Sequence, residues 1–331
     1  MLNLILGRQL SGKSYYLLKT AESISLSGGN VVMIVPEQYT FEMQKKLLKE
    51  LGPEVSNRIN ILSFTGLCED IGNCYGGISG ITVDDGIRFI LVKNALKSVS
   101  DSLKHYRRYV NSPEFAKQML TVIGEMKTAA VSPEALAELS VSLEPSLFAD
   151  KLHDISLILK CYDSLLLSKF ADPFDLTKKT VEKLPDNSYF SGKVFLIDEF
   201  KGFTETQYLL LDRIISASDD VYVSFCCDST SLSGATEVFS NIKKNVARLK
   251  ELAVSRGEKV KEITVSETGR YKTTALSRFE EYLAEKSLDK FSDSASEITV
   301  VNAESTSKEI DYVMRTVKRL VREKGYRYND F

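Results

Sequence analysis

The chain has 331 residues, with 43 Lys or Arg against 45 Asp or Glu, so its formal net charge is −2. A composition of 43% hydrophobic and 27% charged residues is ordinary for globular proteins and excludes disordered, collagen-like and disulfide-scaffold chains. The small net charge also excludes a DNA-coating protein, so any nucleic-acid surface must be a local patch.

The first 64 residues alternate between apolar runs and helical patterns. Strands are predicted at 2–6, 31–35 and 59–64, and helices at 14–25 and 41–51. The apolar runs do not alternate with polar residues, which is typical of strands covered by helices on both faces. The segment therefore predicts a βαβ unit in a parallel sheet.

A block of helices is predicted to interrupt this sheet. From residue 84 to about 184, apolar residues recur every three or four positions, and proline stands only at segment boundaries. Apolar strands return at 194–197 and 221–226. We expect an α/β core formed by residues 1–83 and 190–256, with a helical insertion at 84–189.

The last part of the chain predicts the start of a second α/β domain, residues 257–331. A helix at 238–252 ends the core, and the second domain is predicted to contain helices at 275–285 and 307–324, a strand at 298–301 and a Ser-rich linker at 290–297. The final residues, Asp330 and Phe331, resemble the approach to a further strand. We therefore expect the sequence to be a piece of a longer protein.

Neither a membrane segment nor a metal-binding cluster is indicated. No apolar run approaches the roughly 18 residues of a membrane span, and the N-terminal MLNLILG lacks the basic region of a secretory signal. The five cysteines have no paired C-x-x-C spacing, and the two histidines, His105 and His153, stand far apart. We expect a cytoplasmic protein without a disulfide framework, a zinc site or a His-based catalytic centre.

A phosphate-binding loop is the strongest chemical signal. The sequence GRQLSGKS matches G-x-x-x-x-G-K-[ST] directly after a predicted strand and before a predicted helix. In such loops backbone N–H groups hold the phosphates, the lysine reaches the β- and γ-phosphates, and the serine hydroxyl binds Mg²⁺. The predicted nucleotide-binding residues are Gly7, Arg8, Gln9, Leu10, Ser11, Gly12, Lys13 and Ser14.

An acidic pair at the end of another predicted strand complements the loop. Asp198 and Glu199 follow the apolar run VFLI, the place where P-loop proteins hold Mg²⁺ and polarise the attacking water. Asp198 is predicted to bind Mg²⁺ and Glu199 to act in catalysis. More than half of the chain separates Lys13 from Asp198, too far for a compact nucleotide kinase, whereas superfamily 1 helicases carry a helical insertion between these motifs.

The sequence resembles the N-terminal helicase-like region of the AddB/RexB family, the B subunit of the bacterial ATP-dependent helicase/deoxyribonuclease. The resemblance rests on ILGRQLSGKS, VPEQYTFEMQ, NILSFTGL, VFLIDEFKGFTETQ and the C-terminal EIDYVMRTVKRLVREKGYRYNDF. It implies ATP and Mg²⁺ as cofactors, DNA ends and single strands as substrates, and an AddA-type helicase–nuclease partner subunit. It also implies a nuclease domain with an iron–sulphur cluster beyond residue 331, to which none of the cysteines here belongs.

One departure from working helicases affects the expected activity. Superfamily 1 motors place G-D-x-x-Q after the strand that follows the acidic pair, whereas residues 226–231 read CCDSTS, which lacks the glycine and the glutamine. We therefore expect Mg-ATP binding with little or no hydrolysis. Two alternatives stay open: a stand-alone P-loop switch or phosphotransferase that does not act on DNA, and a structural module with a vestigial loop.

Candidate DNA contacts are of two kinds. Lys104, Arg107 and Arg108 alternate with aromatic residues, which suits phosphate contact and base stacking, although a solvated helix face explains them as well. Phe64 falls where motors of the resembling family place a DNA-contacting loop, and it is either a stacking residue or a core residue. A further basic stripe within 315–322 is typical of an amphipathic helix.

Overall fold

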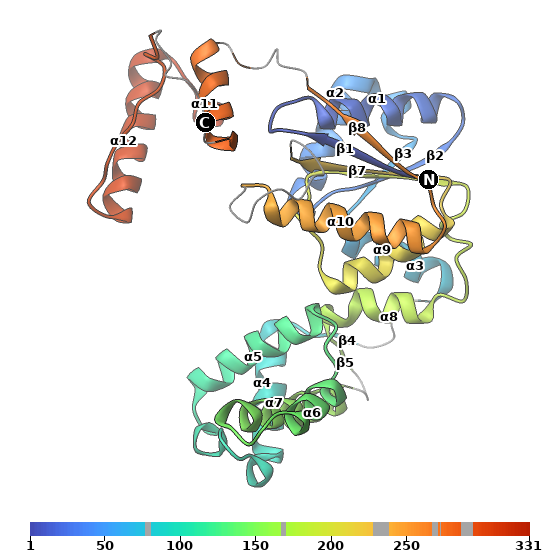
Figure 1. Ribbon diagram of the computed structural model, residues 1–331, viewed down its shortest axis with the longest axis vertical. Helices are drawn as coiled ribbons and strands as arrows, with labels where there is room; N and C mark the ends of the chain where they lie inside the picture. The colour runs from blue at the N-terminus through green and yellow to red at the C-terminus, as the bar shows by residue number, and fades with distance from the viewer. Residues whose placement is uncertain (77–80, 167–169, 228–237, 267–270, 272, 286–293) are drawn as a thin grey trace. The chain divides into compact units, whose positions relative to one another are not determined.

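The apolar runs of the sequence assemble into a parallel β-sheet in the computed structural model of this chain (Figure 1). The structure describes residues 1–76, 81–166, 170–227, 238–266, 271, 273–285 and 294–331. The chain divides into two units, Met1–Glu267 and Thr268–Phe331. The sheet belongs to the first unit.

Six parallel strands form the sheet in the order β3-β2-β6-β7-β1-β8. Their bounds are Leu2–Gly7 for β1, Asn30–Ile34 for β2, Ile59–Leu62 for β3, Lys193–Ile197 for β6, Asp220–Cys226 for β7 and Val260–Thr264 for β8. Every residue of β1 is buried, as are all but the first of β2 and β6. The expected α/β class, with strands covered on both faces, is therefore confirmed.

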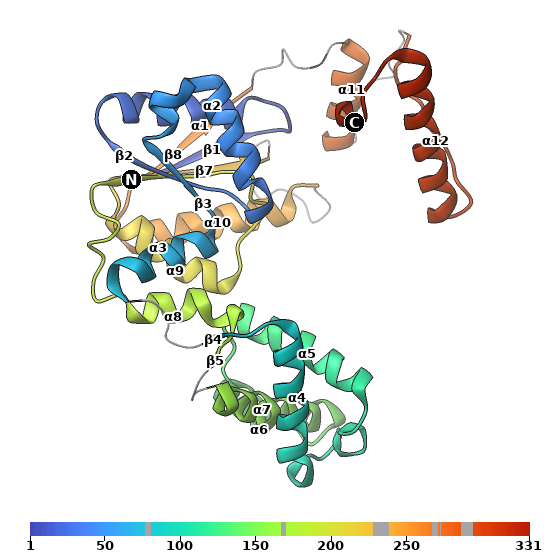
Figure 2. The same ribbon diagram turned by 180° about the vertical axis from the view of Figure 1, so that it is seen from behind.

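Helices cover both faces of the sheet (Figures 1 and 2). On one face lie α1 (Lys13–Leu26) and α2 (Thr40–Ser56), which pack against Ile5. The opposite face is covered by α3 (Phe64–Tyr75), α9 (Glu205–Ala217) and α10 (Ser240–Ser255), and α8 (Leu176–Lys183) packs on the outer side of α3 and α9 (Figure 1). Because successive strand residues point to opposite faces, Leu4 and Leu6 contribute to this second core.

Strand β8 extends the sheet beyond the expected boundary of the core. Its sequence, VKEIT, contains two charged residues and has no apolar run, so the pattern predicts no strand there. It nevertheless pairs with β1 along five residues as an edge strand, where charged side chains reach solvent. The predicted boundary between residues 256 and 257 therefore falls inside the first unit.

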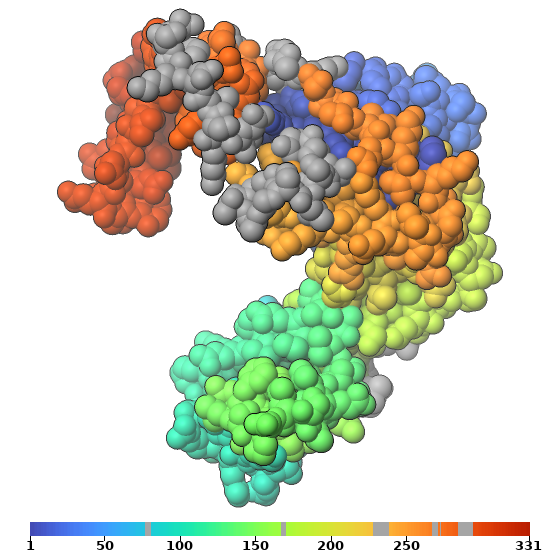
Figure 3. All heavy atoms as spheres, in the orientation of Figure 1, coloured from blue at the N-terminus to red at the C-terminus, as the bar shows by residue number. Residues whose placement is uncertain are grey.

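The helical block has a hydrophobic core of its own (cyan to green in Figure 3). Its main helices are α4 (Asp85–Ser98), α5 (Pro113–Thr128), α6 (Pro133–Ser142) and α7 (Leu147–Leu166). Serines 112 and 132 cap α5 and α6, each followed by a proline at the first helical position, which is a favourable helix start. A two-stranded parallel ribbon, β4 (Ile81–Thr82) with β5 (Phe170–Ala171), closes the block.

The second unit contains α11 (Thr274–Glu285) and α12 (Thr306–Lys324), both close to their predicted bounds. The strand predicted at 298–301 is wrong: these residues form no strand, and Val300 is 87% exposed. A strand needs a partner to satisfy its backbone groups, and no described segment of this unit provides one. Within the described part of the chain, no helix has the length and apolar character needed to cross a membrane.

Buried charges link the helices of the block to the segment that precedes α8. The Lys127 ammonium, 7% exposed, lies 2.7 Å from the carboxylates of both Asp163 and Asp175. Burial by itself lowers the pKa of Lys127, but the two carboxylates outweigh it and raise that pKa above its usual value. Lys127 thereby joins α5 to α7 and to the chain leading into α8.

Replacing Lys127 by Ala is expected to lower the free energy of unfolding by about 3 kcal/mol, because it removes the buried cation of the cluster and leaves Asp175 with only Lys179, 3.6 Å away. Urea denaturation followed by circular dichroism measures the change. The matched control is Lys178→Ala, which removes a lysine 4.0 Å from Glu182 on the surface of α8. That control should change stability by less than about 0.5 kcal/mol, and equal losses would contradict the prediction.

Candidate functional site

The loop between β1 and α1 has a backbone that depends on its glycines. Gly12, directly before α1, has a φ of 97°, in the left-handed region that glycine adopts without strain. At Gly7 a Cβ atom would lie 2.5 Å from the carbonyl oxygen of Val265, just after β8, so no larger residue fits. Gly12 therefore permits the turn and Gly7 the close approach of the two chain segments.

The polar side chains of this loop make contacts within the protein. The Lys13 Nζ donates a hydrogen bond to the carbonyl oxygen of Arg8 at 2.7 Å. The Ser14 hydroxyl donates to Glu199 Oε1 at 3.2 Å. The buried hydroxyl of Ser11 has no hydrogen-bond partner among the described residues. The predicted loop residues thus form one cluster at the N-terminus of α1.

Asp198 is the buried acid of the site. It lies at the end of β6, is 1% exposed, and its backbone N–H donates to the carbonyl oxygen of Ile34 in β2. Its Oδ1 accepts a hydrogen bond from the Ser224 hydroxyl and another, at 3.0 Å, from the backbone N–H of Glu199. Its Oδ2 is buried without a partner in the described part of the chain.

The loop and the acidic pair meet at the carboxyl edge of the sheet. The Ser14–Glu199 contact joins them, and the Cys226 thiol at the end of β7 joins the same loop to the sheet by contacting Gln9 Oε1 at 3.6 Å. One side of this edge carries the Lys13 ammonium and the N-terminus of α1, which favour anions. The other side carries two carboxylates, which favour cations. Such an arrangement suits an anion that carries a divalent metal.

Phe64, the predicted stacking residue, is a core residue in this structure. It begins α3 and is 5% exposed. Its ring centroid lies 5.3 Å from that of Phe200 and 6.0 Å from that of Phe203. These contacts favour the interpretation of Phe64 as a core residue over that of a stacking residue, because little of the ring is accessible to a base.

The predicted basic cluster of the helical block is organised by a buried acid. The carboxylate of Asp154 accepts hydrogen bonds from three successive backbone N–H groups, those of residues 104–106. At the surface, Lys104 lies 3.4 Å from Asp150, and Arg107 lies 3.0 Å from Asp101. The Arg108 guanidinium stacks on Tyr109. Acidic neighbours therefore neutralise part of the positive charge of this cluster.

A surface that the sequence analysis did not single out lies beside the acidic pair. Tyr39 and Phe41, directly before and within the start of α2, are 44% and 69% exposed. A cleft of about 470 Å³ is lined by Tyr39, three lysines of α2 and Glu199. The lysines are Lys45, Lys46 and Lys49; none forms an ion pair with a described residue, although Glu42 and Glu50 of the same helix also line the cleft. Exposed aromatic residues beside lysines were the available signal in VPEQYTFEMQKKLLK.

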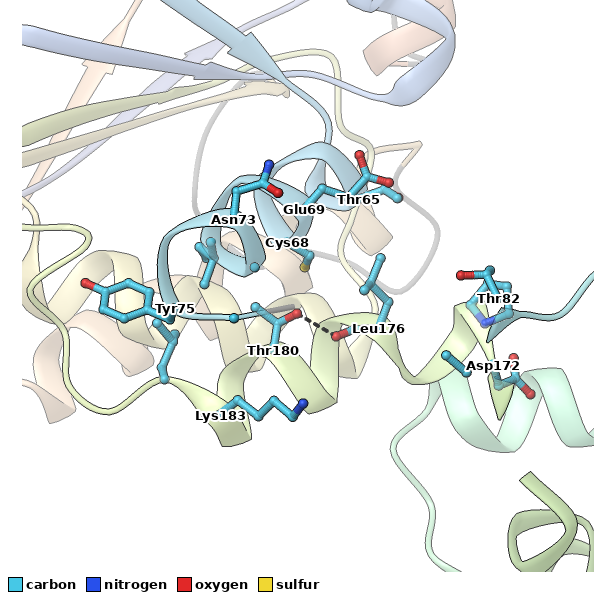
Figure 4. Close-up of a pocket in the computed structure, with 16 residues that line it drawn as sticks. Thr65, Cys68, Glu69, Asn73, Tyr75, Thr82, Asp172, Leu176, Thr180 and Lys183 are labelled. Carbon is cyan, nitrogen blue, oxygen red and sulfur yellow. Dashed lines mark hydrogen bonds between the residues drawn. The ribbon is translucent and has the colours of Figure 1, made fainter. Parts of the chain in front are cut away.

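Another cavity, of about 350 Å³, lies between α3, α8 and the β4–β5 ribbon (Figure 4). Two of its polar groups are engaged locally: the Thr180 hydroxyl donates to the carbonyl oxygen of Leu176 at 2.8 Å, and the Cys68 thiol contacts Thr177. Burial raises the pKa of Cys68, so the thiol stays protonated and is a poor nucleophile or metal ligand. The cavity lies on the face of the sheet opposite to α1.

A family model described as "ADDB, N-terminal" matches residues 4–280. The chain is similar to proteins named as the B subunit of an ATP-dependent helicase/deoxyribonuclease. Identity is 29% for the protein of Clostridioides difficile (strain 630), 28% for that of Thermoanaerobacter sp. (strain X514) and 27% for that of Bacillus thuringiensis subsp. konkukian (strain 97-27). The alignments cover 98–99% of this chain but only 29% of each relative.

The backbone conformation of Glu199 is expected to lower the stability of the fold. Its φ is 66°, a left-handed conformation that disfavours side chains with a Cβ. Replacing Glu199 by Gly should therefore raise the free energy of unfolding by about 0.5–1 kcal/mol, measured by urea denaturation. Glu199→Ala, the matched control, removes the same carboxylate but keeps the Cβ. If both variants shift stability equally, the backbone explanation is refuted.

Proposed function

This chain belongs to the ADDB, N-terminal family, and we propose that it is the ATP-binding, helicase-like part of the B subunit of a bacterial helicase–nuclease that processes DNA ends for repair. The single observation that carries the proposal is the meeting of the GRQLSGKS loop with Asp198 and Glu199 at one edge of a parallel sheet. The relatives' name calls them ATP-dependent and designates them as one subunit among others, which supports ATP as ligand and the presence of a partner subunit. We propose that this partner is of the AddA type. The chain spans 29% of their length, so the activity proposed is that of a larger assembly.

The side chains that would hold the nucleotide form hydrogen bonds within the protein in this structure. The Lys13 ammonium would exchange the carbonyl oxygen of Arg8 for phosphate oxygens, and the Ser14 hydroxyl would exchange Glu199 for Mg²⁺. Asp198, with one carboxylate oxygen unpartnered among the described residues, would accept from water bound to the metal. Mg²⁺ supplies charge neutralisation to the phosphates when bound. Glu199, released from Ser14, would be free to orient a water molecule, although we propose that hydrolysis is slow or absent.

A calorimetric titration of Mg-ATP into the 331-residue chain tests the site. The wild type is expected to bind, and Lys13→Ala to lose at least tenfold in affinity, because the ammonium no longer balances the phosphate charge. The matched control is Lys19→Ala, which removes a lysine of the same helix that pairs with Glu22 on the surface. Failure of the wild type to bind Mg-ATP would refute this part of the proposal. ATP binding without any DNA binding would instead favour the alternative of a P-loop switch.

Single-stranded DNA contact is the second part of the proposal. Lys104, Arg107 and Arg108 stay predicted contacts. The lysines of α2 share their cleft with exposed Tyr39 and with three glutamates, Glu42, Glu50 and Glu199, but none of these lysines forms an ion pair with a described residue. An exposed aromatic surface with unpaired lysines suits a sequence-tolerant strand contact. We therefore propose that the α2 lysines, which form no ion pair with a described residue, make more phosphate contacts than Lys104 and Arg107, which do form ion pairs.

The salt dependence of binding to a single-stranded oligonucleotide separates the two surfaces. The double variant Lys45→Ala and Lys49→Ala should reduce the slope of log K against log salt by about 1.4, since each phosphate contact on a single strand contributes about 0.7. The matched double variant, Lys104→Ala and Arg107→Ala, should reduce it less, because both cations already pair with acids. A larger reduction of the slope in the Lys104 and Arg107 variant than in the Lys45 and Lys49 variant would contradict the proposed role of the α2 surface. A wild-type slope near zero would refute DNA contact altogether.

A further inference from the structure

The buried carboxylate of Asp198 is held on one side only. Its Oδ1 has two donors, the Ser224 hydroxyl and the Glu199 backbone N–H, whereas its Oδ2 has none in the described part of the chain. An ionised carboxylate offers about four acceptor positions, and a buried carboxylate oxygen without a donor is destabilising. The asymmetry therefore leaves Oδ2 as the atom of Asp198 with capacity for another contact.

Ser224 reaches Asp198 from the neighbouring strand. It lies on β7, which separates β6 from the loop strand β1, and it pairs in register with Ile5 of β1. Val223 pairs with Ile197, so Ser224 and Asp198 follow one step further along adjacent strands. Ser224 is 3% exposed, and its hydroxyl is fixed between the two strands that carry the predicted site.

Alternation along the strands places both side chains on the face covered by α1. Ile5, Val194 and Leu196 belong to the core formed with α1 and α2. Asp198 is two residues after Leu196, and Ser224 is the register partner of Ile5, so both share that face. The same helix begins with Lys13 and Ser14. The Ser224–Asp198 contact therefore lies beneath the end of α1 at which phosphate and Mg²⁺ would bind.

We propose that Ser224 is a positioning residue for the Mg²⁺ that accompanies the nucleotide. By donating to Oδ1, it fixes the rotation of the Asp198 carboxylate and leaves Oδ2 for water bound to the metal. The inference rests on the proposed ATP site and adds to it a residue outside both sequence motifs. Partners that orient a metal-binding carboxylate typically contribute ten- to a hundredfold to metal affinity.

The experiment measures the affinity of the 331-residue chain for ATP calorimetrically, with Mg²⁺ and with EDTA, in wild type and Ser224→Ala. Ser224→Ala is expected to reduce the enhancement by Mg²⁺ at least tenfold and to leave affinity for metal-free ATP within about twofold. Ser224→Thr keeps a hydroxyl on the strand and should restore most of the enhancement. The matched control is Ser156→Ala, which removes a buried serine hydroxyl from α7, where it donates to the carbonyl oxygen of His153 at 2.7 Å.

Each outcome bears on a different claim. If Ser224→Ala keeps the wild-type Mg²⁺ enhancement, the positioning role is overturned while the ATP site stands. An equal loss with Mg²⁺ and with EDTA indicates a general structural effect and also overturns the role. If the wild type binds no ATP under either condition, both the proposed ATP site and this inference fail. Thermal unfolding of each variant identifies any that does not fold. If Ser224→Ala is one of these, Ser224→Thr is compared with the wild type instead, and a folded Ser224→Thr without the Mg²⁺ enhancement overturns the role.

Discussion

Parallel pairing of β6, β7 and β1 is the constraint on which the candidate site depends. In a parallel sheet the carboxyl ends of all strands meet at one edge, where ligands of open α/β sheets commonly bind. Lys13 and Asp198 are separated by more than half of the chain, yet they follow two strands of this sheet with only β7 between them. Hydrogen bonding between parallel strands thus brings Lys13 and Asp198 to the same edge of the sheet, although the local sequence around neither residue specifies that they lie close together.

The helical block can be inserted between these strands because it does not rely on the sheet for its core. Its apolar side chains form a separate cluster, and buried ion pairs around Lys127 join its helices to the chain that returns toward α8. The entropy of closing a loop grows only slowly with its length, so a folded insertion of this size is compatible with the register of β2 and β6. The block therefore adds a third core to the two that flank the sheet, and all three lie within one unit.

Much of the fold could be predicted because its signals are local. The unalternating runs of β1 and β2 require burial on both faces, and GRQLSGKS requires a turn between a strand and a helix. Strand β8 escaped prediction because an edge strand needs no apolar run, and the strand predicted at 298–301 failed because a strand needs a partner that sequence alone does not show. For Phe64, the sequence could not choose between stacking and burial, since the neighbours that decide lie at 200 and 203.

The left-handed backbone at Glu199 lies between two contacts that reach opposite faces of the sheet. Glu199 contacts Ser14, and the next residue, Phe200, packs its ring against Phe64 at the start of α3. Consecutive Cα atoms are fixed about 3.8 Å apart, so these two contacts cannot move independently. The peptide unit between Glu199 and Phe200 therefore connects the start of α1, on one face of the sheet, to the aromatic cluster on the other face.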